Sequence, residues 1–440
     1  VRLALPGLPD RGYPLARRAG LLLLAYLVWL AGSYEIGFNR ATISLALLGI
    51  LALSLLLGFT QRKELAEEWK TRRQYFWRVE VLFLVFFLLF LLVRLGNPDV
   101  WHPYKGGEKP MDFAYFNAVL KSTTFPPYDP WYAGGYLNYY YFGFVMVAVL
   151  VKWLGIVPAV AYNLILPTLF SLIALGAFSL AWNLYHAAVK NPRFSYTTGL
   201  AGALGTALLG NLGTLQLIFT GFQRLGSPSG VLEGSHFFER FSWGIKGFFE
   251  AVGGAPLPLG LGDWYWNPSR AIPGLGDVEP ITEFPYFTVL YADLHAHLIA
   301  LPLTLLALSF ALSLVLSRAR WKNNAGVLAG FFLGALAIGA LRPTNTWDLP
   351  TYLAIGVVAL VYSLSTSYQP SPAWLERLPL LRRFSLPTLR VLVSAAGAAL
   401  LVALTLLLYQ PFSSWYALGY SQVNLWNGPR TPLGSYLQHW

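Results

Sequence analysis

The sequence carries two groups of ionisable residues whose types and spacing suit acid–base or ligand-binding chemistry. The first comprises Glu108, Lys109 and Asp112, in the first turns of a helix that the sequence predicts to begin near Pro110. A carboxylate in an aromatic setting near a membrane surface can be tuned by partial burial to act as a base. Asp112 is therefore a candidate base. The alternative is that Asp112 only offsets the dipole at the N-terminus of its helix.

The second group comprises Asp293, His295 and His297, which follow Glu283 at the start of an apolar run. Ionisable groups at membrane depth are costly, so they indicate a functional site. If Asp293 caps a helix, His297 lies one turn on, whereas His295 points about 200° away. A tight site for Mg²⁺ or Mn²⁺ therefore needs a distorted backbone, and its candidate ligands are Asp293 and His297. Hydrogen bonding to a phosphate or substrate and a purely structural network are the alternatives.

Further candidate substrate-binding residues lie elsewhere in the chain. Arg270, in the segment NPSR, is suited to pair with an anionic phosphate. Arg342 and Asn345 lie with Asp348 in LRPTNTWDLPTY, at the end of another apolar run. Tyr140 belongs to a run of three tyrosines that also suits a membrane interface, where one end of the ring is wet. The two histidines of the second group complete this predicted substrate-binding set.

The composition indicates which solvent surrounds these residues. Of the 440 residues, 56% are hydrophobic and only 12% are charged, whereas soluble domains carry about 25% charged residues. The deficit predicts an all-α, polytopic membrane protein whose main solvent is lipid. Cysteine is absent, which excludes disulfides, thiolate nucleophiles and cysteine-ligated zinc.

Nine apolar runs are candidates to cross the roughly 30 Å of membrane hydrocarbon. They lie at Ala19–Ile36, Ala41–Phe59, Val79–Leu95, Ala159–His186, Thr198–Phe219, Ala292–Leu316, Gly326–Leu341, Pro350–Leu364 and Val391–Tyr409. A tenth run, Tyr139–Leu154, is short and opens with aromatic residues, so it is either a span or a helix lying at the interface.

Charge decides between these topologies, because basic residues accumulate on the cytoplasmic side. With Arg11, Arg17 and Arg18 inside and Tyr139–Leu154 not crossing, the basic clusters at 62–78, 190–193, 318–322 and 377–390 all lie inside. We therefore predict nine spans, an interfacial helix and a cytoplasmic N-terminus in the cell (plasma) membrane. The net charge of +11 then reflects topology and contact with anionic membrane lipids, and no nucleic-acid partner is expected.

This topology places the polar segments on one face. Residues 1–78 form a predicted transmembrane hairpin and cytoplasmic linker, and residues 79–440 a bundle with outer loops 96–158 and 221–285. Pro126-Pro127 and Gly134-Gly135 are turn signals that fold the first loop back on itself. The chain is expected to continue beyond residue 440. The three polar clusters should meet at the outer membrane surface.

Several motifs resemble those of the YYY-domain membrane protein family, an uncharacterised group named for a tyrosine run. They are KPMDFAYFNA, DPWYAGGYLNYYYFG, NPSR, EFPYF with DLHAH, and NTWDLPTY. The resemblance covers roughly Gly20 to Trp440. Members often carry a proline between the two histidines, where this chain has Ala296.

The layout is also similar to that of the C-type glycosyltransferase superfamily. In those enzymes a large outer loop carries a catalytic acid and is followed by an interfacial helix, and the next span ends in a basic turn. Asp112, Tyr139–Leu154 and Lys190 with Arg193 occupy the matching places. The resemblance implies that Asp112 deprotonates or orients an acceptor that attacks a lipid-phosphate-linked sugar.

The leading hypothesis is a membrane glycosyltransferase with a polyprenyl-phosphate sugar donor. Asp112 would be the base and Glu108 would assist it, while the histidines and arginines hold the donor phosphate or a metal. The alternatives are a non-enzymatic scaffold or subunit of a larger membrane complex, a transporter of a lipid-linked sugar, and a metal-dependent hydrolase. The scarcity of charges within the apolar runs argues against ion-coupled transport.

Overall fold

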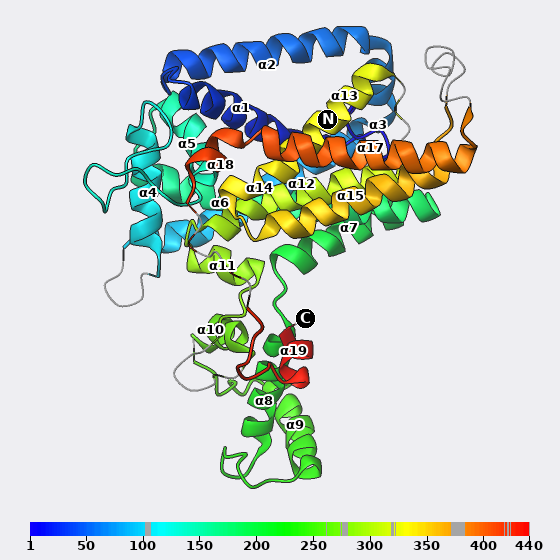
Figure 1. Ribbon diagram of the computed structural model, residues 1–440. Helices are drawn as coiled ribbons and strands as arrows, with labels where there is room; N and C mark the ends of the chain where they lie inside the picture. The colour runs from blue at the N-terminus through cyan, green and yellow to red at the C-terminus, as the bar shows by residue number, and fades with distance from the viewer. Residues whose placement is uncertain are drawn as a thin grey trace. The chain divides into compact units, whose positions relative to one another are not determined.

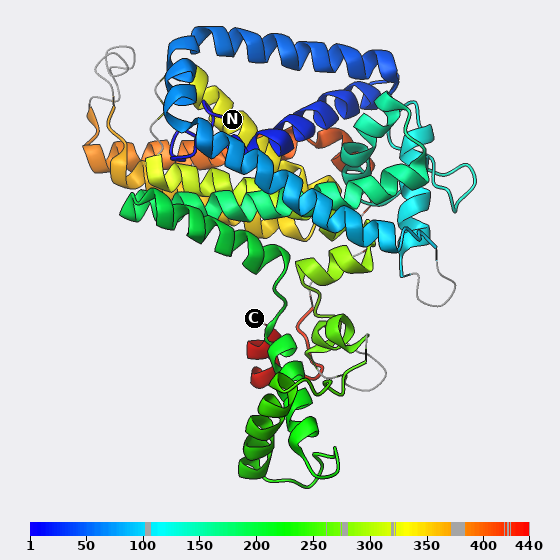
Figure 2. The same ribbon diagram turned by 180° about the vertical axis from the view of Figure 1, so that it is seen from behind.

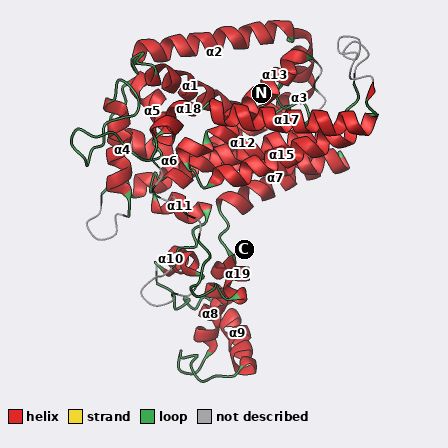
Figure 3. Cartoon of the chain, viewed as in Figure 1, coloured by secondary structure: helices red, strands yellow, loops and turns green. Residues whose placement is uncertain are grey.

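The regular secondary structure of the described residues is all-helical, as predicted. The computed structural model describes residues 1–101, 107–260, 262–272, 274, 280–317, 321, 323–370, 383–417, 419, 422 and 424–439. These residues form helices and no strand, apart from one isolated bridge between Tyr128 and Tyr136 (Figures 1 and 3). The basic residues Arg318, Arg320, Lys322, Arg377 and Arg382, which were predicted to lie inside, fall outside the described residues.

The chain divides into two compact units. Unit 1 consists of Val1–Thr206 and Ala292–Gly419, and unit 2 of Ala207–Tyr291 and Tyr420–Trp440. Unit 1 contains all eight helices that are individually long and apolar enough to cross a membrane. These are η1–α1 (Tyr13–Leu15 and Ala16–Ser33), α2 (Arg40–Thr60), α3 (Arg62–Gly96), α6 (Pro158–Val189), α12 (Ala296–Ser317), α13–α14 (Asn324–Gly339 and Leu341–Thr344), α15 (Asp348–Ser367) and α17 (Leu386–Leu407).

Burial differs strongly among these helices. α6 and α12 are the most deeply buried, and both are apolar on all sides, as expected of helices at the centre of a bundle. α2 lies at the edge of unit 1 and is almost entirely exposed (Figures 1 and 2). An exposed helix built mostly of leucine, isoleucine and alanine is suited to a lipid environment rather than to water.

The fifth predicted span is not one continuous helix. Instead of a helix over Thr198–Phe219, the chain forms α7 (Pro192–Ala207) and α8 (Leu212–Gly226). Asn211 ends the run because its side chain caps α8, accepting a hydrogen bond from Gly213 N at 3.0 Å, and its Nδ2 donates to Pro268 O at 2.7 Å. Over the part of the chain that the structure describes, the count is therefore eight candidate spans, or nine if α7 and α8 form one broken span.

The predicted interfacial helix is α5 (Phe142–Leu154), which has 13 residues. At about 1.5 Å per residue it is too short to cross the hydrocarbon. Nine of its residues are buried, and it packs against α1, α4 (Lys109–Lys121) and α14. Neighbouring helices of unit 1, rather than a water–lipid boundary, therefore cover most of its surface.

The predicted cytoplasmic linker is helical, and it continues directly into the third span. α3 runs for 35 residues without a break, through the boundary that was expected after Arg78. At its basic end Arg2 pairs with Glu64 at 2.5 Å and with Glu68 at 3.2 Å, which fixes the N-terminal segment against α3. Arg18, predicted to be a cytoplasmic anchor, is instead buried and donates to the carbonyl of Leu172 in α6.

Unit 2 is built on a close pair of helices, α8 and α9 (Phe237–Val252). Glycines permit the approach, since a Cβ atom on Gly247 would lie 1.9 Å from Phe222 O. Shorter elements complete the two units. Those of unit 2 are α10 (Asp263–Trp266), η2 (Asn267–Arg270), α11 (Pro285–Tyr291) and α19 (Leu433–His439), and α18 (Gln410–Trp415) belongs to unit 1.

Candidate functional site

The first predicted group lies at the start of α4, as the sequence indicated. Pro110 stands in the first turn of α4, where its missing N–H costs nothing, and Asp112 follows in the same turn. The side chain of Asp112 is fully buried. Among the described residues, neither of its carboxylate oxygens has a hydrogen-bond partner.

The second group lies on a distorted backbone. Ala292 has a φ of 66°, and α12 begins only at Ala296, so Asp293 does not cap a regular helix. Tyr162 of α6 holds this segment in place: its hydroxyl accepts from Leu294 N at 2.9 Å and donates to Ala292 O at 3.0 Å.

This distortion has a consequence for the two histidines. In a regular helix His295 and His297 would diverge, but here their Nδ1 atoms are 2.9 Å apart. One imidazole donates to the other, and the tautomers determine which. The sequence predicted that a compact site would need such a backbone.

The two groups meet in unit 1. Glu108 Oε2 lies 2.6 Å from His295 Nε2, and Glu108 N donates to Asp293 Oδ2 at 3.1 Å. We call Glu108, Asp112, Asp293, His295 and His297 the carboxylate–imidazole cluster. A chain of hydrogen-bonding groups thus runs from Glu108, whose side chain is 57% exposed, through His295 to His297.

The electrostatics of the cluster favour a neutral Asp112. Burial, and to a smaller extent the nearby carboxylates of Asp293 and Glu108, raise the pKa of Asp112 to about 9, while Lys109 opposes them. Burial also lowers the pKa of Lys109. At neutral pH Asp112 is therefore a protonated acid in the resting protein.

The third predicted cluster adjoins the second. Asn345 Nδ2 donates to Asp348 Oδ2 at 3.0 Å, and both α14 and α15 pack against α12, the helix that contains His297. Arg342 is half-buried, and its guanidinium forms no hydrogen bond or ion pair within the described part of the chain. Its predicted role in binding a substrate phosphate remains a prediction.

Among the tyrosines, a neighbour of the predicted residue contacts the cluster. Tyr139 Oη lies 3.1 Å from His295 Nε2, whereas the ring of Tyr140 packs on Tyr416 at 5.8 Å. Sequence reasoning missed Tyr139 and Tyr162 as cluster contacts. The tyrosine run was a signal for Tyr139, but nothing local distinguishes Tyr162 from other rings within an apolar run.

Arg270 belongs to unit 2, and its contacts are described there. Its guanidinium lies over the Trp266 ring at 4.2 Å, and Nη1 donates to Ser269 Oγ at 2.8 Å. Binding of an anionic phosphate by Arg270 remains a prediction.

The metal prediction concerns Asp293 and His297. Within the described ranges, no group of three or more His, Asp or Glu side chains has the arrangement of a metal site. Binding of Mg²⁺ or Mn²⁺ by these two residues remains a prediction.

Comparison with known proteins supports the membrane setting. The model of a family described as "Uncharacterized membrane protein (DUF2298)" matches residues 23–440, which include the whole carboxylate–imidazole cluster. No curated protein matches the chain, and no solved structure matches it. These comparisons support neither the resemblance to C-type glycosyltransferases nor the YYY-domain name.

Proposed function

This chain belongs to the family of uncharacterised membrane proteins DUF2298, and we propose that it is a multi-pass membrane glycosyltransferase. The proposed donor is a sugar linked to a polyprenyl phosphate, and the proposed acceptor is a hydroxyl group. The proposal places the cluster at the non-cytoplasmic face of the cell membrane and the N-terminus in the cytoplasm.

One observation carries the proposal: Asp112 is fully buried and its carboxyl group has no hydrogen-bond partner in the described part of the chain. Buried polar groups are normally hydrogen-bonded, because an unsatisfied one costs free energy. A carboxyl group with a purely structural role would have a partner. An unsatisfied one, surrounded by further ionisable groups, is better explained by a bound substrate that supplies the partner.

The proposed step is a single displacement. The acceptor oxygen attacks the anomeric carbon, the bond from that carbon to the donor phosphate oxygen breaks, and polyprenyl phosphate leaves. The acceptor proton passes to the carboxylate of Asp112. Transfer by this route inverts the anomeric configuration.

The cluster also offers a route for the proton. Asp112 is protonated at rest, so it has to lose that proton before it can act as a base. Glu108 is the N-cap residue of α4, one turn before Asp112, and pairs with His295 at 2.6 Å. The carboxyl group of Asp112 forms no hydrogen bond to Glu108 or His295, so a bound acceptor hydroxyl would have to bridge Asp112 and Glu108. Because Glu108 reaches the solvent, Glu108 and His295 could then carry the proton to water. No step of the proposal is assigned to a metal ion.

The test is sugar transfer by the Asp112→Asn variant. The full chain would be reconstituted in liposomes with radiolabelled polyprenyl-phosphate glucose or mannose and an acceptor lipid extract. Loss of the base should lower the transfer rate by roughly 10²-fold or more. Asp129→Asn is the matched control, since Asp129 is a partly exposed carboxylate of the same loop whose side chain bonds only Trp131 N within the described residues.

Undiminished transfer by Asp112→Asn would refute the assignment of the base. Absence of transfer by the unaltered protein from either donor would count against the reaction itself.

A second candidate function rests on unit 2. Phe237, Phe238 and Phe249 on α9 are 73%, 81% and 66% exposed. Exposed aromatic clusters mark interaction surfaces, so a non-enzymatic subunit of a larger membrane complex is the alternative. Co-purification with other subunits in fixed stoichiometry, without sugar transfer, would favour it.

A further inference from the structure

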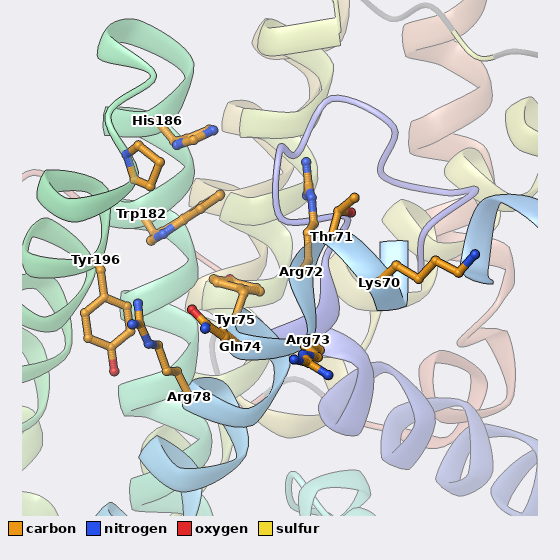
Figure 4. A pocket seen from close by; sticks show the side chains of 11 residues that line it. Lys70, Thr71, Arg72, Arg73, Gln74, Tyr75, Arg78, Trp182, His186 and Tyr196 are labelled. Carbon is orange, nitrogen blue, oxygen red and sulfur yellow. The ribbon is translucent and has the colours of Figure 1, made fainter. Parts of the chain in front are cut away.

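Unit 1 has a pocket that the proposed function does not use. It lies between α3, α6 and α7 and has a volume of about 530 Å³. Its basic lining residues are Lys70, Arg72, Arg73 and Arg78, all on α3. Its other wall is aromatic and is formed by Trp182, His186 and Tyr196 (Figure 4).

The pocket lies at the opposite end of the bundle from the carboxylate–imidazole cluster. α3 and α6 are antiparallel, since Arg94 Nε donates to Asn163 Oδ1 at 2.9 Å near the cluster and the rings of Tyr75 and Trp182 are 5.0 Å apart at the pocket. Tyr162 bonds the backbone on either side of Asp293 in the cluster. From Tyr162 to His186 the helix rises by about 36 Å. That distance is about one membrane thickness.

The charge of the pocket is not compensated. The four basic residues form no ion pair with any carboxylate that the structure describes, and no Asp or Glu lines the pocket. Arg72 Nη1 donates to Pro9 O at 2.5 Å, which fixes one guanidinium at the wall. In Figure 4 Arg72 and Arg78 lie on the side of α3 that faces the aromatic wall, whereas Lys70 points away from it.

The aromatic wall is ordered by its own contacts. Trp182 and His186 stack with their ring centroids 4.4 Å apart, and His186 Nδ1 lies 3.0 Å from Ser195 Oγ. The guanidinium of Arg78 lies 5.2 Å from the centroid of the Tyr196 ring. The Tyr196 ring thus holds the Arg78 guanidinium beside the cavity, and guanidinium groups suit phosphate oxygens.

We propose that this pocket binds a phosphate group, and that its source is the headgroup of an anionic lipid. Three observations support the lipid: α3 and α6 are candidate spans, the pocket lies about one membrane thickness from the cluster, and its aromatic rings are of the kind found at membrane interfaces. The inference does not rest on the proposed glycosyltransferase activity.

The test is a binding titration of the purified full chain in neutral detergent. Dioctanoyl phosphatidic acid, dioctanoyl phosphatidylcholine and inorganic phosphate would be added separately, and Kd measured by thermophoresis. We expect saturable binding of phosphatidic acid, weakened about fivefold or more by Arg78→Gln, an exposed position, and likewise by Arg72→Gln. Arg62→Gln is the matched control, because Arg62 is exposed on the same helix and does not line the pocket.

Inorganic phosphate that binds as tightly as phosphatidic acid, with the same sensitivity to Arg78→Gln, would assign the site to a water-soluble phosphate. The proposal is overturned if both pocket variants bind phosphatidic acid like the unaltered chain. It is equally overturned if Arg62→Gln loses as much affinity, because the attraction then comes from the general charge of α3.

Discussion

Asp112 is held in an environment that opposes its charge. Burial contributes most to its raised pKa, followed by Asp293 and Glu108. Its neutral form is therefore the one that the fold stabilises. This dependence on protonation should be visible in stability as well as in activity.

We predict that the stability conferred by Asp112 falls as the pH rises. In the unfolded chain its carboxyl group loses its proton near the ordinary pKa of 3.8, whereas in the folded chain it keeps the proton up to a pKa of about 9. The folded state binds more protons across this window, so the free energy of unfolding decreases from about pH 4 to about pH 9. Asp112→Asn removes the effect and should be more stable than the unaltered chain at pH 8, by on the order of 2 kcal/mol.

Unfolding in detergent at pH 5 and at pH 8 measures this difference. The stability gained through Asp112→Asn should be larger at pH 8. Equal gains at both pH values would show that Asp112 is not protonated in the folded protein.

Residue types alone indicated most of the cluster. Asp112, Asp293 and His295 stood out because ionisable groups are rare in an apolar chain. Tyr162 did not, because its role depends on hydrogen bonds to Ala292 and Leu294, about 130 positions away in sequence. Such long-range contacts leave no local pattern in the sequence.

At the scale of elements, α6 supports the cluster through one side chain. The Tyr162 hydroxyl satisfies a carbonyl and an N–H of the non-helical segment before α12. That segment includes Ala292, whose φ of 66° is a left-handed conformation that residues other than glycine seldom adopt. Without the hydroxyl, two buried backbone groups would lose their partner.

We predict that Tyr162→Phe lowers the free energy of unfolding by about 1–3 kcal/mol, the usual cost of leaving buried hydrogen-bonding groups unsatisfied. If the proposed function holds, it should also slow sugar transfer, because His295 follows the segment directly. Tyr185→Phe is the control, since Tyr185 lies on the same helix and its hydroxyl has no hydrogen bond among the described residues. Equal stability of the two variants in a thermal unfolding assay would contradict the supporting role of Tyr162.

Hydropathy predicted most helices but not their interruptions. The long apolar runs became helices because lipid leaves backbone groups no other partners. The break between α7 and α8 depends on a single capping side chain, Asn211, within an otherwise apolar stretch. The burial of nine of the 13 residues of α5 depends on tertiary packing, which a hydropathy pattern does not specify.

At the scale of the whole molecule, the topology of unit 1 requires a crossing that no single helix supplies among the residues described between Pro192 and Ala292. Pro192 lines the basic pocket, whereas Ala292 contacts Tyr162 beside the cluster. The basic pocket and the cluster are about one membrane thickness apart along α6. The chain therefore crosses between Pro192 and Ala292, and α7, with 16 residues, spans only about 24 Å of that distance. This favours nine crossings over eight.

The absence of cysteine gives a direct test of this topology. We predict that a membrane-impermeant maleimide added to intact cells labels Tyr132→Cys, which lies in the exposed loop closed by the Tyr128–Tyr136 bridge. Lys63→Cys, at the basic end of α3, should react only after the cells are permeabilised. Both positions are exposed, so a difference in labelling between the two cysteines can come only from the membrane barrier. Labelling of both cysteines from outside would place the start of α3 and the loop between α4 and α5 on the same side of the membrane. The cluster and the basic pocket could then not face opposite leaflets, whatever activity the protein proves to have.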